Sequence, residues 1–364
     1  MSAGSARASG ALVVRKVRYV LRGPEDEVLN ALRERGTATL SGASGMGKSS
    51  TAYFLAGRLW QEGKIAIIIR PSYVAEGLRG VLVEVRPWEG EGGPLVAPVI
   101  EVPATLTGEE LALVVRAILE VVSKAEEFEE ALRKVGWRPR ELGKALREAT
   151  KPMGFSERLL KFVQSMGVIE TAALAITSFL TSLSAAILTT SVFLAANWLA
   201  GKLRARRLRA RVKENLGRAI LIFDDASVLE DILSVVRAIR DTAREMGTSL
   251  PGLLFVVRVG VGDLAEYVAN RPAYVRKKIP VEKVLRSSWS KDNIIDLFAI
   301  GDLRTFEAVI RANRELYEKE PSEEELEALF RATGGIPALA LMFLAVGLDP
   351  RTVKPAEGIW AFSQ

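Results

Sequence analysis

Residues 42–49 read Gly42-Ala43-Ser44-Gly45-Met46-Gly47-Lys48-Ser49, and Ser50 follows them. This stretch matches the pattern G-x-x-x-x-G-K-[ST] at every fixed position. The glycines of such a stretch let the backbone turn so that successive N–H groups point at phosphate oxygens. Lys48 adds a positive charge at those phosphates, and the Ser49 hydroxyl is a ligand for Mg²⁺. The sequence therefore predicts a phosphate-binding loop, residues 42–50, with an exposed Lys48.

The residues on both sides of the loop have the pattern that such a loop needs. Residues 37–41 are predicted to form a strand, and an apolar-periodic helix is predicted from Lys48 to about Glu62. Residues 65–69 form a continuous apolar run, which is typical of a buried parallel strand. The glycine pattern therefore lies between a strand and a helix, which is the context in which it binds phosphate.

A second apolar run, residues 219–223, ends in two acids, Asp224 and Asp225. An acidic residue at the end of a buried strand is the other half expected of a site for Mg²⁺ and a nucleoside triphosphate. We expect Asp224 to hold Mg²⁺ through water and Asp225 to orient or activate the attacking water. Asp is also a favoured helix N-cap residue, and a capping role is compatible with these roles.

Predicted strands and helices alternate along the rest of the chain. The further strands are residues 13–21, 81–85, 96–102, 253–257 and 280–285. The further helices are residues 24–35, 108–133, 141–147, 228–244, 290–300, 302–317, 322–332 and 337–347. This alternation predicts an α/β fold, a doubly wound parallel sheet of the P-loop NTPase type. The terminal helices are expected to form a small lid.

Taken in order, these features resemble P-loop ATPases of the additional-strand class, within the archaeal-ATPase and STAND group related to AAA+ proteins. Besides the loop and the double acid, the resemblance is carried by Arg22-Gly23-Pro24-Glu25-Asp26-Glu27, Leu253-Leu254-Phe255-Val256-Val257-Arg258 and Thr333-Gly334-Gly335-Ile336-Pro337-Ala338-Leu339-Ala340. It implies that Arg258 contacts the γ-phosphate and that Pro337 packs near the adenine. It also implies a switch or motor that uses ATP and Mg²⁺, with Lys48, Asp225 and Arg258 as catalytic residues.

The composition excludes several other kinds of chemistry. The chain of 364 residues contains neither cysteine nor histidine. This excludes a disulfide framework, a Ser-His-Asp or Cys-His mechanism and the commonest transition-metal sites. The remaining acids, bases and hydroxyls suit Mg²⁺ and phosphate. A net charge of +6 permits an anionic partner without requiring one.

The chain between residues 69 and 224 is far longer than a crossover between neighbouring strands needs. Residues 171–201 carry no charge, and seven Lys and Arg residues follow within 202–213. We expect residues 162–201 to form an apolar hairpin at the cytoplasmic membrane face, with 202–213 on anionic lipid. Lys48 and Asp224 must meet on one side of any membrane, which requires an even number of crossings or none. A soluble buried hairpin and a nucleic-acid patch are the alternatives.

These patterns predict a tail at residues 1–20, a core at 21–285 interrupted by an insertion at 71–215, and a lid at 286–364. The expected function is an ATP-driven switch or motor held at the membrane by the inserted hairpin. A soluble nucleic-acid-associated ATPase of the replication-initiator or defence type is a second hypothesis. A nucleotide-dependent scaffold with negligible turnover is a third, and a homo-oligomeric active form fits all of them.

Overall fold

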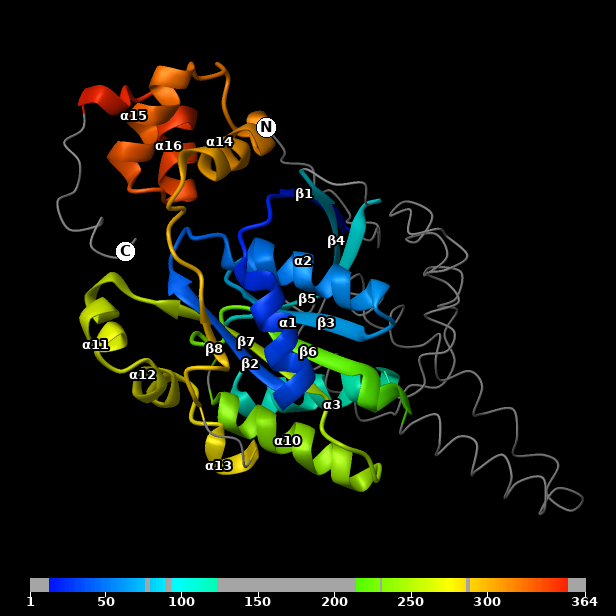
Figure 1. The fold of residues 1–364 in the computed structure, drawn as a ribbon. Coiled ribbons are helices and arrows are strands. Elements are labelled where there is room, and N and C mark those ends of the chain that lie inside the picture. Colours follow the sequence, from blue (N-terminus) through cyan, green and yellow to red (C-terminus); the bar gives the residue numbers. More distant parts are fainter. Residues whose placement is uncertain are drawn as a thin grey trace, which may run out of the picture.

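The computed structural model describes residues 13–75, 79–88, 93–122, 214–229, 231–285 and 289–352. In these residues one sheet contains eight strands in the spatial order β1-β4-β5-β3-β6-β7-β2-β8 (Figure 1). The strands are β1 (Val13–Tyr19), β2 (Thr37–Ala43), β3 (Ile65–Ser72), β4 (Arg79–Pro87), β5 (Leu95–Pro103), β6 (Ala219–Phe223), β7 (Gly252–Val259) and β8 (Ile294–Asp296). Neighbouring strands are parallel except β4 and β5, which are antiparallel. The predicted α/β fold with a mostly parallel sheet is confirmed.

Helices cover both faces of the sheet (Figure 1). The helices of the core are α1 (Pro24–Arg35), α2 (Lys48–Gln61), α3 (Gly108–Val122), α10 (Ile232–Glu245), η1 (Val261–Asp263), α11 (Leu264–Ala269), α12 (Arg271–Lys278) and α13 (Glu282–Leu285). Helices α1 and α2 lie on one face, whereas α3 and α10 pack on each other at the other. The lid contains α14 (Leu303–Ala312), η2 (Arg314–Leu316), α15 (Glu323–Thr333), α16 (Pro337–Val346) and η3 (Pro350–Thr352).

The apolar runs of the sequence become the central strands because both faces of the sheet are covered. All five residues of β6 are buried, as expected for a parallel strand between two helical layers. Phe223 of β6 and Phe255 of β7 stack with ring centroids 5.5 Å apart, which ties the two strands together in the core.

Strand β7 lies between β2 and β6, so the strand before the glycine-rich loop and the strand before the two acids are not neighbours. The three strands are parallel, and their carboxyl ends therefore reach the same edge of the sheet. This edge brings residues that follow β2, β6 and β3 to one place, which is where open α/β sheets bind ligands.

Two local predictions are wrong. Residues 280–285 do not form a strand: Glu282–Leu285 form the short helix α13, and the buried Val281 and Val284 have the i, i+3 spacing of a helical turn. The predicted helix 290–300 contains β8, whose three residues pair with Thr39, Leu40 and Ser41 of β2. A strand of three residues is too short to show the alternation of apolar and polar residues that identifies a strand. Its extended conformation comes from pairing with β2.

The sheet also crosses three of the predicted domain boundaries. Strand β1 lies within the predicted tail, β4 and β5 lie within the predicted insertion, and β8 lies within the predicted lid segment. The division into domains otherwise stays a prediction.

The hairpin at 162–201 and the basic segment at 202–213 lie outside the described residues. No helix in the described ranges is both long enough and apolar enough to cross a membrane.

The lid has a small core of its own, to which Phe306, Ile310, Leu326, Leu329 and Ala340 contribute. Its backbone packs tightly against the linker that leaves β8. The Ile300 N–H donates to the Gly335 carbonyl oxygen at 2.9 Å, and a Cβ at Gly335 would lie 2.0 Å from the Ile300 carbonyl oxygen. Only glycine fits this contact.

We expect Gly335→Ala to lower the free energy of unfolding more than Gly347→Ala does, measured by urea denaturation. Both residues have a φ of +72°, so alanine at either costs about 1–2 kcal/mol of backbone strain. Nothing lies within 4 Å of a Cβ at Gly347, whereas the clash at Gly335 adds about 1–3 kcal/mol. Equal losses for the two variants would show that the lid does not pack on the linker in this way.

Candidate functional site

The glycine-rich loop connects β2 to α2 and has the backbone shape that its sequence predicts. Gly45 has a φ of 83° and Gly47 a φ of 85°, a left-handed conformation that glycine adopts without a steric penalty. Gly47 is the N-cap of α2 and makes no side-chain cap hydrogen bond. The first backbone N–H groups of α2 and the positive end of its dipole therefore face the loop, which favours an anion there.

Lys48 lies partly buried against this loop, so the expectation of an exposed side chain is wrong. Its Nζ donates to the carbonyl oxygen of Ala43 at 2.6 Å. Burial, the largest effect, lowers the pKa of Lys48 to about 8, and the positive charge of Arg258 acts in the same direction. Asp225 and Asp224 oppose this shift, because a nearby carboxylate favours the charged amine.

Ser49 and Asp224 are brought together from the two halves of the chain. The Ser49 hydroxyl donates to Asp224 Oδ1 at 3.0 Å. Asp224 is 1% exposed, and its other oxygen, Oδ2, has no hydrogen-bond partner. Burial raises the pKa of Asp224, whereas Arg70 and the Ser49 hydrogen bond oppose this rise. An ionised carboxylate is costly in such a place unless a cation or a hydrogen bond compensates it.

These two residues fit a magnesium ion. A buried carboxylate beside a hydroxyl offers oxygen ligands of the kind that Mg²⁺ prefers. The described residues contain no group of three or more acids that could hold a metal ion, at this place or at another, so water and phosphate oxygens would have to supply the other ligands.

Asp225 and Arg258 form an ion pair beside this acid. Asp225 has a φ of 54°, an uncommon conformation for a residue other than glycine and one that tends to occur at functional sites. Arg258 lies inside β7 and does not follow its end. Both residues line a pocket of about 330 Å³ together with Lys48, Ser49 and Asp224. The pocket is also lined by Ser44, Gly45, Gly47 and Ser50, so nine of the residues that the sequence analysis selected line it.

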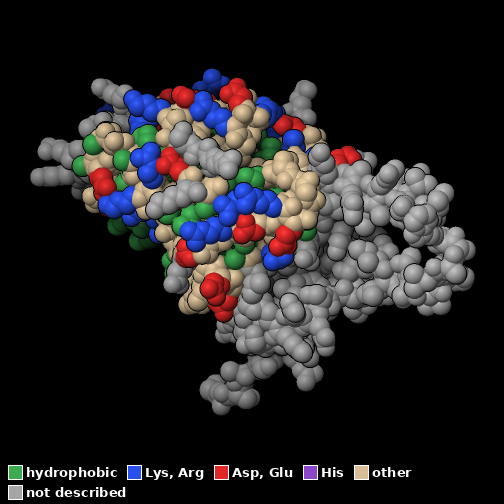
Figure 2. Space-filling model, turned by 90° about the horizontal axis from the view of Figure 1, so that it is seen from below, with side chains coloured by type: hydrophobic (Ala, Val, Ile, Leu, Met, Phe, Trp, Pro, Cys, Tyr) green, Lys and Arg blue, Asp and Glu red, His purple; other side chains and the backbone are tan. Residues whose placement is uncertain are grey.

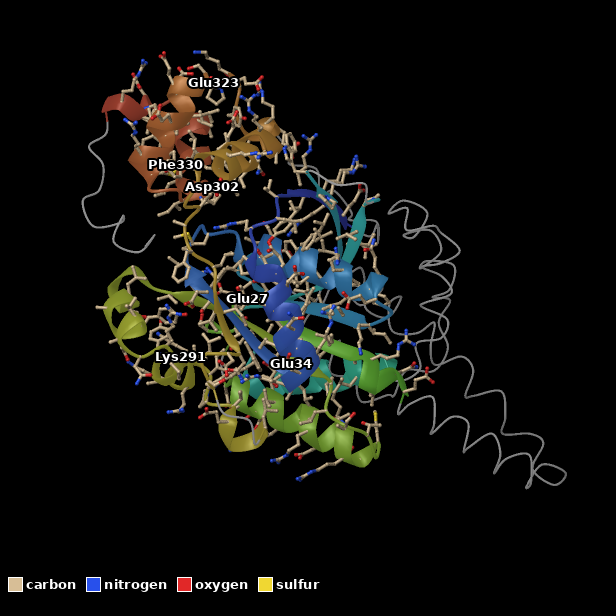
Figure 3. The ribbon with its side chains drawn as sticks, viewed as in Figure 1. Glu27, Glu34, Lys291, Asp302, Glu323 and Phe330 are labelled. Atoms are coloured by element: carbon tan, nitrogen blue, oxygen red, sulfur yellow. The ribbon has the colours of Figure 1, made fainter. Side chains whose placement is uncertain are left out.

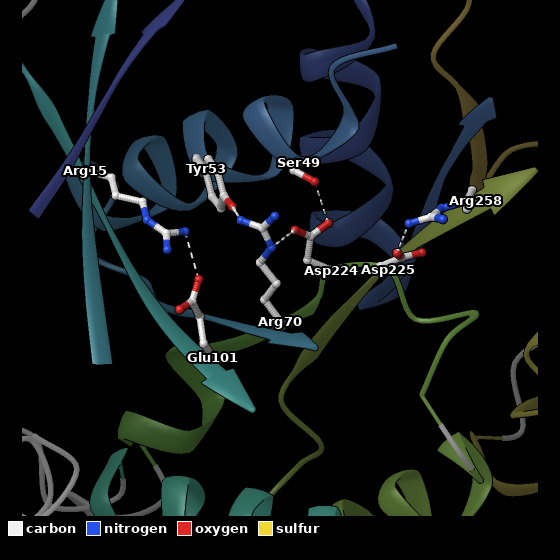
Figure 4. A network of polar contacts seen from close by, with 8 residues as sticks. All are labelled: Arg15, Ser49, Tyr53, Arg70, Glu101, Asp224, Asp225 and Arg258. Carbon is white, nitrogen blue, oxygen red and sulfur yellow. Dashed lines mark hydrogen bonds and ion pairs between the residues drawn. The ribbon is translucent and has the colours of Figure 1, made fainter. Parts of the chain in front are cut away.

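Figure 4 shows a residue in this pocket that the sequence analysis missed, Arg70 of β3. Its Nη1 donates to the Tyr53 hydroxyl at 2.5 Å, and its Nε lies 3.7 Å from Asp224 Oδ2. Burial is the main cause that raises the pKa of Tyr53 to about 12. Arg70 directly follows an apolar run, as Asp224 does, and this shared signal was available in the sequence.

A second, larger pocket of about 590 Å³ lies where α1 begins and the chain passes from β8 to the lid. Glu27, Lys291 and Asp302 line it, from α1, from the turn before β8 and from the N-cap of α14 (Figure 3). Arg22 also lines it, and donates through Nη1 to the Met46 carbonyl oxygen and through Nη2 to that of Phe298. Arg22 therefore joins the glycine-rich loop to the linker of the lid.

The lid touches the loop directly at the start of α16. The Ala338 N–H donates to the Gly45 carbonyl oxygen at 3.4 Å. Pro337 is buried in the first turn of α16, and it lines neither of the two pockets. Pro337 is thus the residue before the one that bonds to the loop. Its predicted position near the adenine stays a prediction.

The comparisons with known proteins give one structural likeness. The chain is similar to a Walker-type ATPase of Pyrococcus abyssi, with 16% sequence identity over 91% of this chain and 69% of that chain and a TM-score of 0.41. No family model matches the sequence, and no curated protein matches it.

We expect the Lys48 amine to titrate near pH 8 in NMR spectra of protein labelled at lysine, below the ordinary value of 10.5. Asp225→Asn should lower this pKa further, because it removes a negative neighbour, whereas Arg258→Gln should raise it, because it removes a positive one. A Lys48 resonance that titrates with the exposed lysines in all three proteins would contradict the partly buried amine.

Proposed function

We propose that the chain binds ATP with Mg²⁺, with the phosphates in the pocket of about 330 Å³, and hydrolyses it. One observation carries this proposal: the hydrogen bond that joins Ser49 to Asp224 across 175 positions of sequence. The same pocket is lined by the glycine-rich loop, Lys48 and both acids. Phosphoryl transfer needs a loop that binds phosphate beside an acid that holds Mg²⁺, because catalysis of this reaction is mostly positioning and electrostatic stabilisation.

Each residue has a role that follows from its position. The N–H groups of the loop and of the first turn of α2 bind phosphate oxygens, and Lys48 leaves the Ala43 carbonyl to bind them. Ser49 and Asp224 hold Mg²⁺, which when bound offsets the charge of the phosphates. Asp225 orients a water molecule or accepts its proton. Arg258 pairs with Asp225 through one nitrogen and one oxygen, which leaves the other polar atoms of both side chains for a ligand.

We place the nucleoside in the larger pocket, between the edge of the sheet and the lid. Arg22 supports this placement, because it lines that pocket and also contacts the glycine-rich loop. The position of β7 between β2 and β6 supports the additional-strand class, and the helical lid that touches the loop supports a STAND-like switch. In this proposal, ATP hydrolysis changes the contact between the loop and α16.

The described surface gives less support to the nucleic-acid-associated alternative. A binding surface for nucleic acid needs a patch or stripe of positive charge. On the face seen in Figure 2, Lys and Arg side chains lie next to Asp and Glu side chains. Surface ion pairs among the described residues also include Arg276 with Glu282 at 2.5 Å and Lys277 with Glu266 at 3.0 Å. This face is therefore mixed in charge.

The membrane association of residues 162–213 stays a proposal that rests on the uncharged run and the basic residues after it. Basic residues near an anionic surface contribute about 1 kcal/mol each and are screened by salt, whereas an apolar hairpin is not. Flotation of the wild type with anionic vesicles at high salt, and its loss on replacing 162–201 by a short Gly/Ser linker, tests the proposal. Recovery of the wild type in the soluble fraction at low salt would refute it.

Lys48→Ala should weaken the binding of Mg·ATP by about 10- to 100-fold, because it removes a charge-assisted contact worth about 1.5–3 kcal/mol. Lys64→Ala is the matched control, since Lys64 lies beyond the other end of α2 and its loss should leave the affinity unchanged. Titration calorimetry measures both, with circular dichroism to verify folding. Wild-type affinity in a folded Lys48→Ala protein would falsify the proposed site.

The two acids should separate in a kinetic experiment. Asp225→Asn should reduce kcat much more than it weakens Mg·ATP binding, because a group that acts on the attacking water contributes after binding. Asp224→Asn should weaken both, because it removes a ligand of Mg²⁺. Turnover and nucleotide affinity are measured at saturating Mg²⁺. If Asp225→Asn is silent, or if both variants lose binding equally, this division of roles is wrong.

A further inference from the structure

Arg70 lies at the carboxyl edge of the sheet with part of its guanidinium uncommitted. One nitrogen donates to Tyr53 and a second faces Asp224 at 3.7 Å, which is too long for a hydrogen bond. The remaining nitrogen, Nη2, makes no hydrogen bond to the residues that the structure describes. The side chain is 36% exposed and lines the pocket of Lys48 and Asp224. It is therefore a cation held at the proposed phosphate site.

Neighbouring strands show why Arg70 is left to face this pocket. Four charged residues alternate in sign across the sheet: Arg15 of β1, Glu101 of β5, Arg70 of β3 and Asp224 after β6 (Figure 4). Glu101 is in register with Arg70, but it is bonded at 2.8 Å to Arg15. The neighbouring acid thus has its own partner, and Arg70 reaches toward Tyr53 and Asp224 instead.

Tyr53 holds Arg70 in place from the helix that carries the phosphate-binding residues. It lies four positions after Ser49 on α2, so the two side chains are on the same face of the helix. Tyr53 is buried, and its hydroxyl accepts the hydrogen bond from Arg70. The guanidinium is therefore fixed relative to Lys48 and Ser49, which reduces the entropy that a phosphate contact would cost.

We propose that Arg70 is a further phosphate-binding residue, which contacts the terminal phosphate of a bound nucleoside triphosphate. This inference rests on the proposed function. The glycine-rich loop holds the α- and β-phosphates, whereas Arg70 lies beside the acids, on the wall of the pocket toward β3. A phosphate between Lys48 and this wall is the γ-phosphate. The planar guanidinium suits two phosphate oxygens at once, which a lysine amine cannot bind in the same way.

The alternative is that Arg70 serves only as a counter-ion for the buried Asp224. The two roles differ in how they distinguish nucleotides. A counter-ion affects the binding of any nucleotide that brings Mg²⁺ to Asp224, whereas a γ-phosphate contact is absent from ADP. The ratio of the affinities for a triphosphate and for ADP is therefore the quantity that separates them.

The experiment measures the dissociation constants of Mg·ADP and of the Mg²⁺ complex of a non-hydrolysable β,γ-imido ATP analogue by titration calorimetry. For Arg70→Ala, we expect about 10- to 100-fold weaker binding of the analogue and less than about 3-fold weaker binding of ADP. Arg70→Lys should recover part of the lost preference, because it restores the charge without the planar fork. Tyr53→Phe keeps the Arg70 charge but removes the hydrogen bond that holds it. It should lower the preference for the analogue over ADP, as Arg70→Ala does, but by a smaller factor.

Arg33→Ala is the matched control, because it removes an arginine of α1 that pairs with Glu62 at the surface and lines neither pocket. Both of its affinities should equal those of the wild type. Equal losses for the analogue and ADP in the Arg70 variants, or no loss, would overturn the proposal. If Arg70→Ala does not fold, the ratios of Arg70→Lys and Tyr53→Phe decide the question alone. A wild type that binds neither nucleotide would instead refute the proposed function.

Discussion

The buried carboxylate of Asp224 is the constraint around which the site is organised. A charge removed from water costs several kcal/mol unless nearby groups compensate it. In this chain the compensation comes from three groups on two segments: the Lys48 amine and the Ser49 hydroxyl in the first turn of α2, and the Arg70 guanidinium on β3. Each is placed by the parallel sheet, whose carboxyl edge collects the residues that follow β2, β3 and β6. One Asp224 oxygen, Oδ2, still lacks a hydrogen bond and faces the Arg70 Nε at 3.7 Å.

The parts of the site that the sequence predicts are those set by local chemistry. The loop at residues 42–49 is visible because glycine spacing, a lysine and a serine are needed in a fixed order. Asp224 is visible because a buried parallel strand is a continuous apolar run with an abrupt polar end. Arg70 also ends an apolar run, but the contacts that Arg22 and Arg70 make are not visible in this way. Their partners, Phe298 and Asp224, lie more than a hundred positions away, and the topology of the sheet is what brings them together.

The lid is joined to the loop at several points, which gives the molecule a route from the phosphates to the lid. Ala338 bonds to Gly45, Arg22 spans Met46 and Phe298, and Gly335 packs against Ile300. Because these contacts involve backbone atoms, a shift of the loop on phosphate binding must either move α16 with it or break a hydrogen bond. In the proposed function, this contact is the element whose two arrangements a nucleotide would bias.

The central claim is that Ser49 and Asp224 meet around the magnesium ion of a nucleotide held by the glycine-rich loop. A crystal structure of the full chain, grown with Mg²⁺ and a non-hydrolysable β,γ-imido ATP analogue, tests it most directly. We predict phosphate density within hydrogen-bonding distance of the backbone N–H groups of residues 45–49. We also predict a metal ion next to the Ser49 hydroxyl and Asp224, bound to the carboxylate directly or through water. A nucleotide found elsewhere on the molecule, or a loop that stays empty at a saturating concentration of the analogue, would contradict the account.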